Sequence, residues 1–139
     1  MAENVIISKL NSLAHCVDRI RSKTPESLEM LIDDYDLQDI ISLNLERSIQ
    51  ICVDISAHIL AEHDVPVPKT MAESFDNLED LNFIPGDLAI RLKKAVGFRN
   101  LAVHTYSTID WNIVYSIITE RLDDFPEFAR CILAKIDAV

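Results

Sequence analysis

The sequence predicts an all-α fold: a single domain over residues 1–139, built as an antiparallel bundle of four to five main helices. Three observations predict this fold. The chain contains only two glycine and five proline residues, the two types that disfavour helix most strongly. Leucine, isoleucine, alanine, glutamate and aspartate are common, and this composition favours helix. Apolar residues recur at helical spacing, and no segment alternates apolar and polar residues as a strand would. A chain of 139 residues also buries about two thirds of its unfolded surface, which is enough for one core.

The first helix is predicted over residues 3–22, where one apolar stripe runs at alternating steps of four and three. The stripe consists of Ile6, Leu10, Leu13, Val17 and Ile20. Thr24 and Pro25 follow it and have the pattern of an N-cap and a first-turn proline. They predict a short second helix that ends near Asp33.

A long helix is predicted next, over about 36–63, with Asp36 as its N-cap. Its apolar residues cover a broad face, which predicts burial against more than one neighbour. The two prolines within 65–68 cannot continue a helix and predict a loop. Thr70 and Glu73 form a capping-box pattern, which starts a short helix to about residue 81.

Two helical regions complete the prediction. Pro85 suits the first turn of a helix that runs to about Phe98. Asp110 can cap a last helical region over about 111–137, which Pro126 kinks or splits.

The charge of the chain is strongly acidic, with a net value of −10, which argues at first against a nucleic-acid binder. The region 91–106 is an exception, because it contains four basic residues and no acidic one. Arg91, Lys93 and Lys94 are therefore candidates for contacts with phosphate groups. A solvated helix face explains the same charges equally well.

The cysteines and the N-terminus bear on location. Cys16, Cys52 and Cys131 are far apart, odd in number and surrounded by apolar residues, which predicts buried free thiols in a reducing compartment. No basic segment followed by an apolar run marks a secretory signal, and no stretch reaches the roughly 18 apolar residues of a membrane span. We therefore expect a cytoplasmic protein without membrane contact.

The residues that carry chemistry lie in one short cluster, 99–106. Arg99 is a permanent cation, His104 titrates near neutral pH, and Tyr106 supplies a phenol. A neutral imidazole can take the proton of an RNA 2′-hydroxyl, and an imidazolium can protonate the leaving 5′-oxygen. A guanidinium can hold the phosphate, and Asn100 can help to position it. Such a site cleaves a phosphodiester without a metal ion.

The spacing of Arg99 and His104 raises a geometric difficulty. On an uninterrupted helix, residues five apart lie about 140° apart and do not share a face. Two arrangements bring them together. The helix ends near Asn100, helped by Gly97, so that His104 folds back. Alternatively, a two-fold dimer places the arginine of one subunit beside the histidine of the other.

Other readings of these residues are possible. Most histidines in helical proteins are structural, and His15, His58 and His63 are expected to be non-catalytic. An arginine near a helix end often interacts only with the helix dipole. No zinc-peptidase, di-iron, phosphate-loop or dinucleotide-binding pattern is present, so we predict no metal site and no cofactor.

With Asn100 and Tyr106 included, the arginine–histidine pattern resembles that of the HEPN superfamily. More narrowly, it resembles the HepT-like toxins, whose genes lie beside a minimal nucleotidyltransferase of the MNT type. The resemblance covers nearly the whole chain. It includes the long helix at Leu45–Gln50, Asp54 and His58–Leu60, and the closing segment Tyr106–Asp110.

The resemblance implies the toxin of a type II-like toxin–antitoxin system. It implies a homodimeric, metal-independent endoribonuclease with its active sites at the dimer interface. Arg99 and His104 would be catalytic, Asn100 would support them, and Tyr106 would accept AMP groups from the nucleotidyltransferase antitoxin, which supplies its own ATP and magnesium. The dimer would also join two 91–106 segments into one basic groove. There are two alternatives. One is a non-catalytic HEPN module that serves as the dimerising or nucleotide-sensing partner of a nucleotidyltransferase. The other is a plain helical interaction protein in which Arg99 and His104 are structural.

Overall fold

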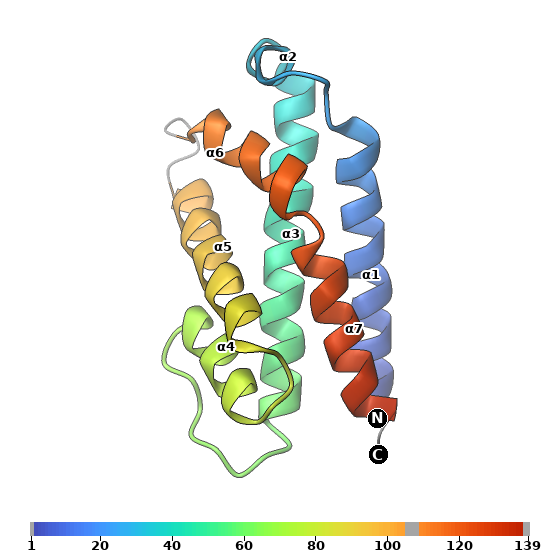
Figure 1. Cartoon of the computed structure of the whole chain (residues 1–139), viewed down its shortest axis with the longest axis vertical. Helices are drawn as coiled ribbons and strands as arrows, with labels where there is room; N and C mark the ends of the chain where they lie inside the picture. The colour runs from blue at the N-terminus through green and yellow to red at the C-terminus, as the bar shows by residue number, and fades with distance from the viewer. Residues whose placement is uncertain (1, 105–108, 138–139) are drawn as a thin grey trace.

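The computed structural model describes the backbone of residues 2–104 and 109–137 and the side chains of residues 3–100 and 109–136. In this part of the chain every regular element is helical, which confirms the all-α prediction (Figure 1). The elements, in order, are α1 (Ala2–Lys23), α2 (Leu28–Ile32), α3 (Tyr35–Leu60), α4 (Met71–Asp80), α5 (Gly86–His104), α6 (Trp111–Ser116), the π-helical turn η2 (Ile117–Arg121) and α7 (Asp124–Asp137). The chain passes along the bundle four times, through α1, α3, α5 and then α6 with α7, so both termini lie at one end.

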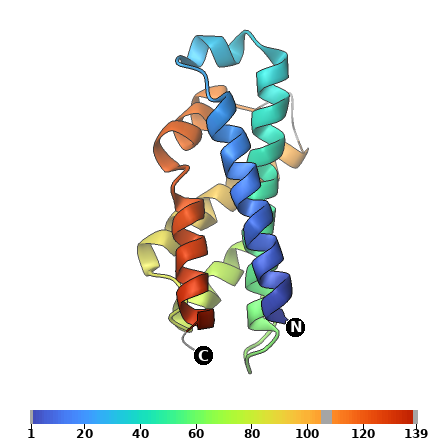
Figure 2. The same cartoon turned by 90° about the vertical axis from the view of Figure 1, so that its right-hand side faces the viewer.

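Helices α1 and α3 form the most extensive contact of the bundle and lie side by side (Figure 2). The stripe that predicted α1 is the face that packs. All of its members are at most 7% exposed: Ile6, Leu10, Leu13, Val17 and Ile20. Burial of each such side chain stabilises the fold by roughly 1.5–3 kcal/mol, which explains why this amphipathic segment is helical in the folded chain.

The cap predicted for the second helix is wrong. The hydroxyl of Thr24 donates to the carbonyl oxygen of Ile20 at 2.8 Å, so Thr24 belongs to the end of α1. Ser27 caps α2 instead, because its Oγ accepts from the amide of Met30 at 3.3 Å. Pro25 therefore lies before the helix and not in its first turn.

The N-cap of the long helix α3 lies two residues earlier than predicted. Asp34 is its N-cap and accepts from the amide of Leu37 at 3.1 Å, whereas Asp36 lies in the first turn. The helix ends at Leu60, three residues before the expected end. Its broad apolar face is confirmed, since α3 packs against α1, α2, α4, α5 and α7.

The loop and the short helix that follow agree with the prediction. Residues 65–68 are not helical, and Thr70 caps α4 by accepting from the amide of Glu73 at 3.1 Å. The carboxylate of Glu73 reaches back to the amide of Lys69, one residue before the position that a capping box would bond. Asn82 ends this region in the left-handed conformation, with φ 63°.

The last helical region is divided, as predicted, and the break lies just before Pro126. Asp110 caps α6 and accepts from the amide of Asn112 at 2.9 Å. The π-helical turn η2 follows, and α7 begins only at Asp124. Pro126 has no N–H to bond the carbonyl of Leu122, and its ring would clash with that carbonyl, so the preceding helix does not continue unbroken into α7. Within α7, Pro126 lies in the first turn, where its N–H is not needed.

The three cysteines are free thiols, as predicted. Cys16 and Cys52 are buried, whereas Cys131 is only half-buried, which corrects the expectation that all three are enclosed. Burial raises the pKa of the Cys52 thiol far above its ordinary value. None of the described helices is long and apolar enough to cross a bilayer.

Candidate active site

The residues of the predicted cluster begin on the last turns of α5, and this helix does not end where we expected. The sequence suggested an end near Phe98 or Asn100, but the backbone is helical through His104. Gly97 does not have a positive φ, and no atom lies within 4 Å of the Cβ that another residue would place there. Gly97 is thus an ordinary position on the open side of the helix and not part of a C-cap.

The continuous helix excludes one of the two arrangements that were proposed to bring Arg99 and His104 together. At about 100° per residue, the two positions lie about 140° apart around α5. The arrangement in which the helix ends near Asn100 and His104 folds back is therefore wrong. The side chain of His104 and the whole of Tyr106 lie outside the described residues.

Arg99 is half-buried, and not all N–H groups of its guanidinium have a hydrogen-bond acceptor among the described residues. It follows the buried residues Leu92 and Val96 in helical register, on the side of α5 that packs against α3 and α4. Its Nη1 lies 3.9 Å from the sulfur of Met71 and donates to Oδ1 of Asn100 at 3.4 Å. Its Nε is buried and has no acceptor among the described residues. A buried donor without a partner costs about 1–3 kcal/mol, so the described residues leave this guanidinium incompletely satisfied.

Glu46 on α3 interacts electrostatically with Arg99, and sequence reasoning did not identify it as a site residue. Burial raises the pKa of the Glu46 carboxyl, and the positive charge of Arg99 offsets part of that rise. The sequence gives little signal, because the neighbours of Glu46 at helical spacing are both apolar, as at Ile49, and polar, as at Gln50. Within the described part of the chain, Arg99 forms no ion pair within 4.0 Å with Glu46 or any other carboxylate.

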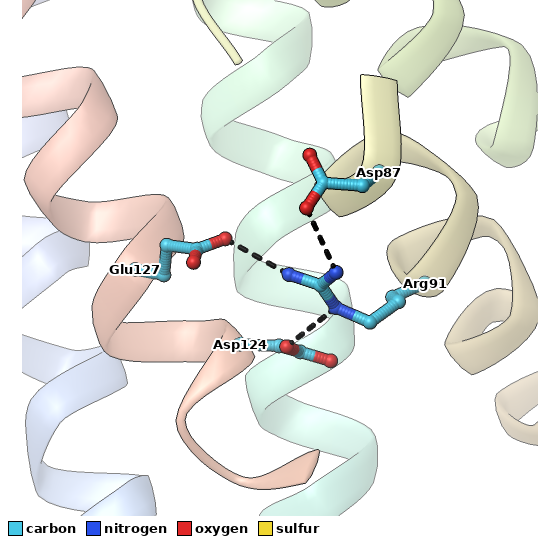
Figure 3. A network of polar contacts seen from close by, with 4 residues as sticks. All are labelled: Asp87, Arg91, Asp124 and Glu127. Atoms are coloured by element: carbon cyan, nitrogen blue, oxygen red, sulfur yellow. Dashed lines mark hydrogen bonds and ion pairs between the residues drawn. The ribbon is translucent and has the colours of Figure 1, made fainter. Parts of the chain in front are cut away.

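Arg91, the first of the three candidate phosphate contacts, is instead surrounded by carboxylates (Figure 3). Its Nε donates to Asp124 at 2.8 Å and its Nη2 to Glu127 at 3.0 Å, both on α7. Its Nη1 donates to Asp87, one turn earlier on α5, at 3.2 Å. Hydrogen bonding to Arg91 lowers the pKa of the Asp87 carboxyl. The network fixes α5 against α7 and leaves Arg91 little capacity to bind a phosphate.

The other two candidates differ from each other. Lys93 is paired with Asp76 on α4, with 2.8 Å between Nζ and Oδ1. Lys94 is exposed and forms no ion pair with the described residues. Of the three, Lys94 is therefore the one whose charge is free for a ligand. In the described ranges no three His, Cys, Asp or Glu side chains gather closely enough to hold a metal ion.

We expect Arg91→Gln to lower the free energy of unfolding by about 1–3 kcal/mol. The reason is that Asp124, whose side chain is 17% exposed, loses its partner while it remains charged. Thermal unfolding followed by circular dichroism measures the change as a fall in Tm of about 3–10 °C. Lys94→Gln is the matched control, because it removes the same charge from the same helix without breaking an ion pair. Equal Tm values for the two variants would show that the network does not stabilise the bundle.

The comparisons with known proteins point to one family. The profile described as ribonuclease HepT-like matches residues 13–132. An mRNA nuclease HepT of Shewanella oneidensis is 34% identical over 132 residues, which covers 95% of this chain and 98% of that protein. A tRNA nuclease HepT of Aphanizomenon flos-aquae is 27% identical over 126 residues, or 91% of this chain and 86% of that protein. Similar proteins are thus named for different classes of RNA.

A solved structure is similar over nearly the whole chain. It is the tri-AMPylated HEPN toxin of Shewanella oneidensis in complex with an MNT antitoxin. The TM-score is 0.87 at 35% identity, and the match covers 94% of this chain and 97% of that one. The helical bundle described above is therefore the fold of a HEPN toxin.

Proposed function

The chain belongs to the ribonuclease HepT-like family, and we propose on that basis that it cleaves RNA as the toxin of a toxin–antitoxin pair. The observation that carries this proposal is the state of Arg99. Its guanidinium is half-buried, its Nε lacks an acceptor, and the described part of the chain supplies no carboxylate within 4.0 Å of it. A purely structural arginine at such a position would be expected to have its donors satisfied.

Arg99 is suited to hold the phosphodiester that is cleaved. A guanidinium stays charged at all physiological pH values and presents two parallel donors to a phosphate. The transition state of cleavage carries extra negative charge on the phosphoryl oxygens, so a fixed cation stabilises it more than the ground state. Asn100, which accepts from Nη1, holds the guanidinium in place.

His104 supplies the acid and base. A neutral imidazole removes the proton of the 2′-hydroxyl, the 2′-oxygen forms a bond to phosphorus, and the bond from phosphorus to the 5′-oxygen breaks. An imidazolium protonates that leaving oxygen. The products are a 2′,3′-cyclic phosphate and a free 5′-hydroxyl, and no step uses a metal ion.

A homodimer brings Arg99 and His104 together. Because both positions lie on one helix about 140° apart, the arginine of one copy would act with the histidine of the other.

Tyr106 is the residue through which a partner would silence the toxin. An MNT-type nucleotidyltransferase antitoxin transfers AMP from ATP to the phenol, and the pyrophosphate leaves. Each AMP adds a negative charge and bulk two residues from His104, where it competes with RNA for Arg99. A cytoplasmic location, in which ATP and RNA are present and thiols stay reduced, suits the three free cysteines.

The purified chain, shown by mass to be unmodified at Tyr106, should cleave RNA in the presence of EDTA and leave 2′,3′-cyclic phosphate ends. The same preparation after AMP transfer by its antitoxin should be inactive. The measurement is a gel assay on mRNA and tRNA substrates with analysis of the product ends, so that it also identifies the class of RNA.

A result that supports the alternative function would be equally clear. If the unmodified chain binds the nucleotidyltransferase but cleaves neither substrate, with or without magnesium, the protein is a non-catalytic HEPN module. Cleavage that requires magnesium and leaves other ends would contradict the mechanism through His104.

A further inference from the structure

A groove of about 390 Å³ lies between α5 and the α6–η2 segment. Its interior is mainly apolar and includes Ala95 and Phe98 from α5 and Ile113 and Ile117 from the other wall. The volume falls in the lower part of the range found for pockets that hold small organic ligands. Nothing in the described chain fills it.

The wall formed by η2 has unusual geometry. A π-helical turn widens the helix locally, and such turns are frequent at functional sites. Here the turn lies between α6 and α7 and brings Ile117 and Arg121 to the groove.

The charges around the groove favour an anionic ligand. Lys94 and Arg121 lie at it, both are exposed, and neither forms an ion pair with the described residues. The acidic group that also lines the groove is Asp124, and its carboxylate accepts from Arg91 at 2.8 Å. Both cations are therefore available to an anion, although the chain as a whole has a net charge of −10.

We propose that this groove binds one nucleotide of a single-stranded RNA substrate, with the base against Phe98 and the phosphate on Lys94 and Arg121. An apolar slot with an aromatic wall suits a base of any sequence, and cations at its rim suit the backbone. Phe98 immediately precedes Arg99, so the bound nucleotide would lie near the phosphodiester that is cleaved. This inference rests on the proposed function and adds a binding subsite to it.

The test measures binding rather than cleavage. The probe is a fluorescent single-stranded 2′-O-methyl RNA, which cannot be cleaved, and its affinity for the full-length protein is followed by anisotropy over a range of salt concentrations. Lys94→Gln combined with Arg121→Gln should weaken binding about tenfold or more. It should also reduce the slope of log affinity against log salt by about 0.7, because the two cations together neutralise one phosphate. Arg130→Gln, an exposed arginine on α7 outside the groove, is the matched control and should leave both unchanged.

A second pair of measurements tests the base. Ser116→Phe places a bulky ring in the groove from an exposed position and should weaken binding about tenfold. A probe that lacks one base should bind the wild type more weakly, but should lose little further affinity for Ser116→Phe. The probe without a base keeps the test decisive even if the Ser116 variant does not fold.

The outcomes separate this inference from the proposed function. If the wild type cleaves RNA but the double variant binds like Arg130→Gln, or the missing base has no effect, the groove is not a nucleotide subsite. If Ser116→Phe converts a dimer to a monomer in sedimentation, the groove is a subunit interface and the inference is wrong. If the wild type neither binds nor cleaves RNA, the inference and the proposed function fail together.

Discussion

Replacing His104 by alanine should lower the rate of RNA cleavage by about 10²–10⁴-fold and leave the Tm within a few degrees of the wild type. The rate falls because the substrate then has no group to accept the 2′ proton or to protonate the leaving oxygen. The fold should persist because His104 is the last residue of α5 and alanine is the strongest helix former. Single-turnover cleavage in EDTA measures the rate, and circular dichroism measures the Tm.

The control for this substitution is His15→Ala, which removes an exposed imidazole from α1. It should cleave at the wild-type rate. The dependence of the cleavage rate on pH is a second readout. The wild type should lose activity at low pH, where His104 can no longer accept a proton, whereas the residual rate of the variant should not fall in this way. A His104→Ala protein that melts at a much lower temperature, and whose activity falls only with its folded fraction, would show a structural histidine.

The bundle could be predicted from the sequence where a pattern extends over many turns. The apolar stripe of α1 predicted both the helix and its buried face, because every member of such a stripe is buried by the same packing. Thr70 and Asp110 were correctly identified as caps, since each is the last capping residue before a helical pattern begins. A long periodic pattern and a well-placed cap were therefore sufficient to predict these helices and where they begin.

The errors arose where several residues compete for one role. Thr24 and Ser27 are both good caps, and only the fold shows that Thr24 bonds back to α1. Asn100 favours a helix end by local preference, but the backbone of α5 stays helical through His104. The approach of Glu46 to Arg99 joins residues far apart in the chain, and no local pattern predicts it.

Mixing two inactive variants should restore RNA cleavage if the active site is shared between subunits. Arg99→Gln and His104→Ala should each be inactive alone. In a dimer of one copy of each, the arginine of the second variant meets the histidine of the first, so one of the two sites is intact. Random exchange makes about half of the dimers mixed, and the activity should return to about one quarter of the wild-type value.

This experiment tests the consequence of the continuous helix directly. The backbone of α5 is helical through His104, so positions 99 and 104 of one chain lie on different sides of it. Two tags allow the mixed dimer to be purified, and its activity should then be about half that of the wild type. If mixed dimers confirmed by native mass spectrometry stay inactive, each site must be built within one chain, which would require α5 to unwind before His104 when RNA binds. Restored activity would place the arginine and the histidine of each active site on different subunits.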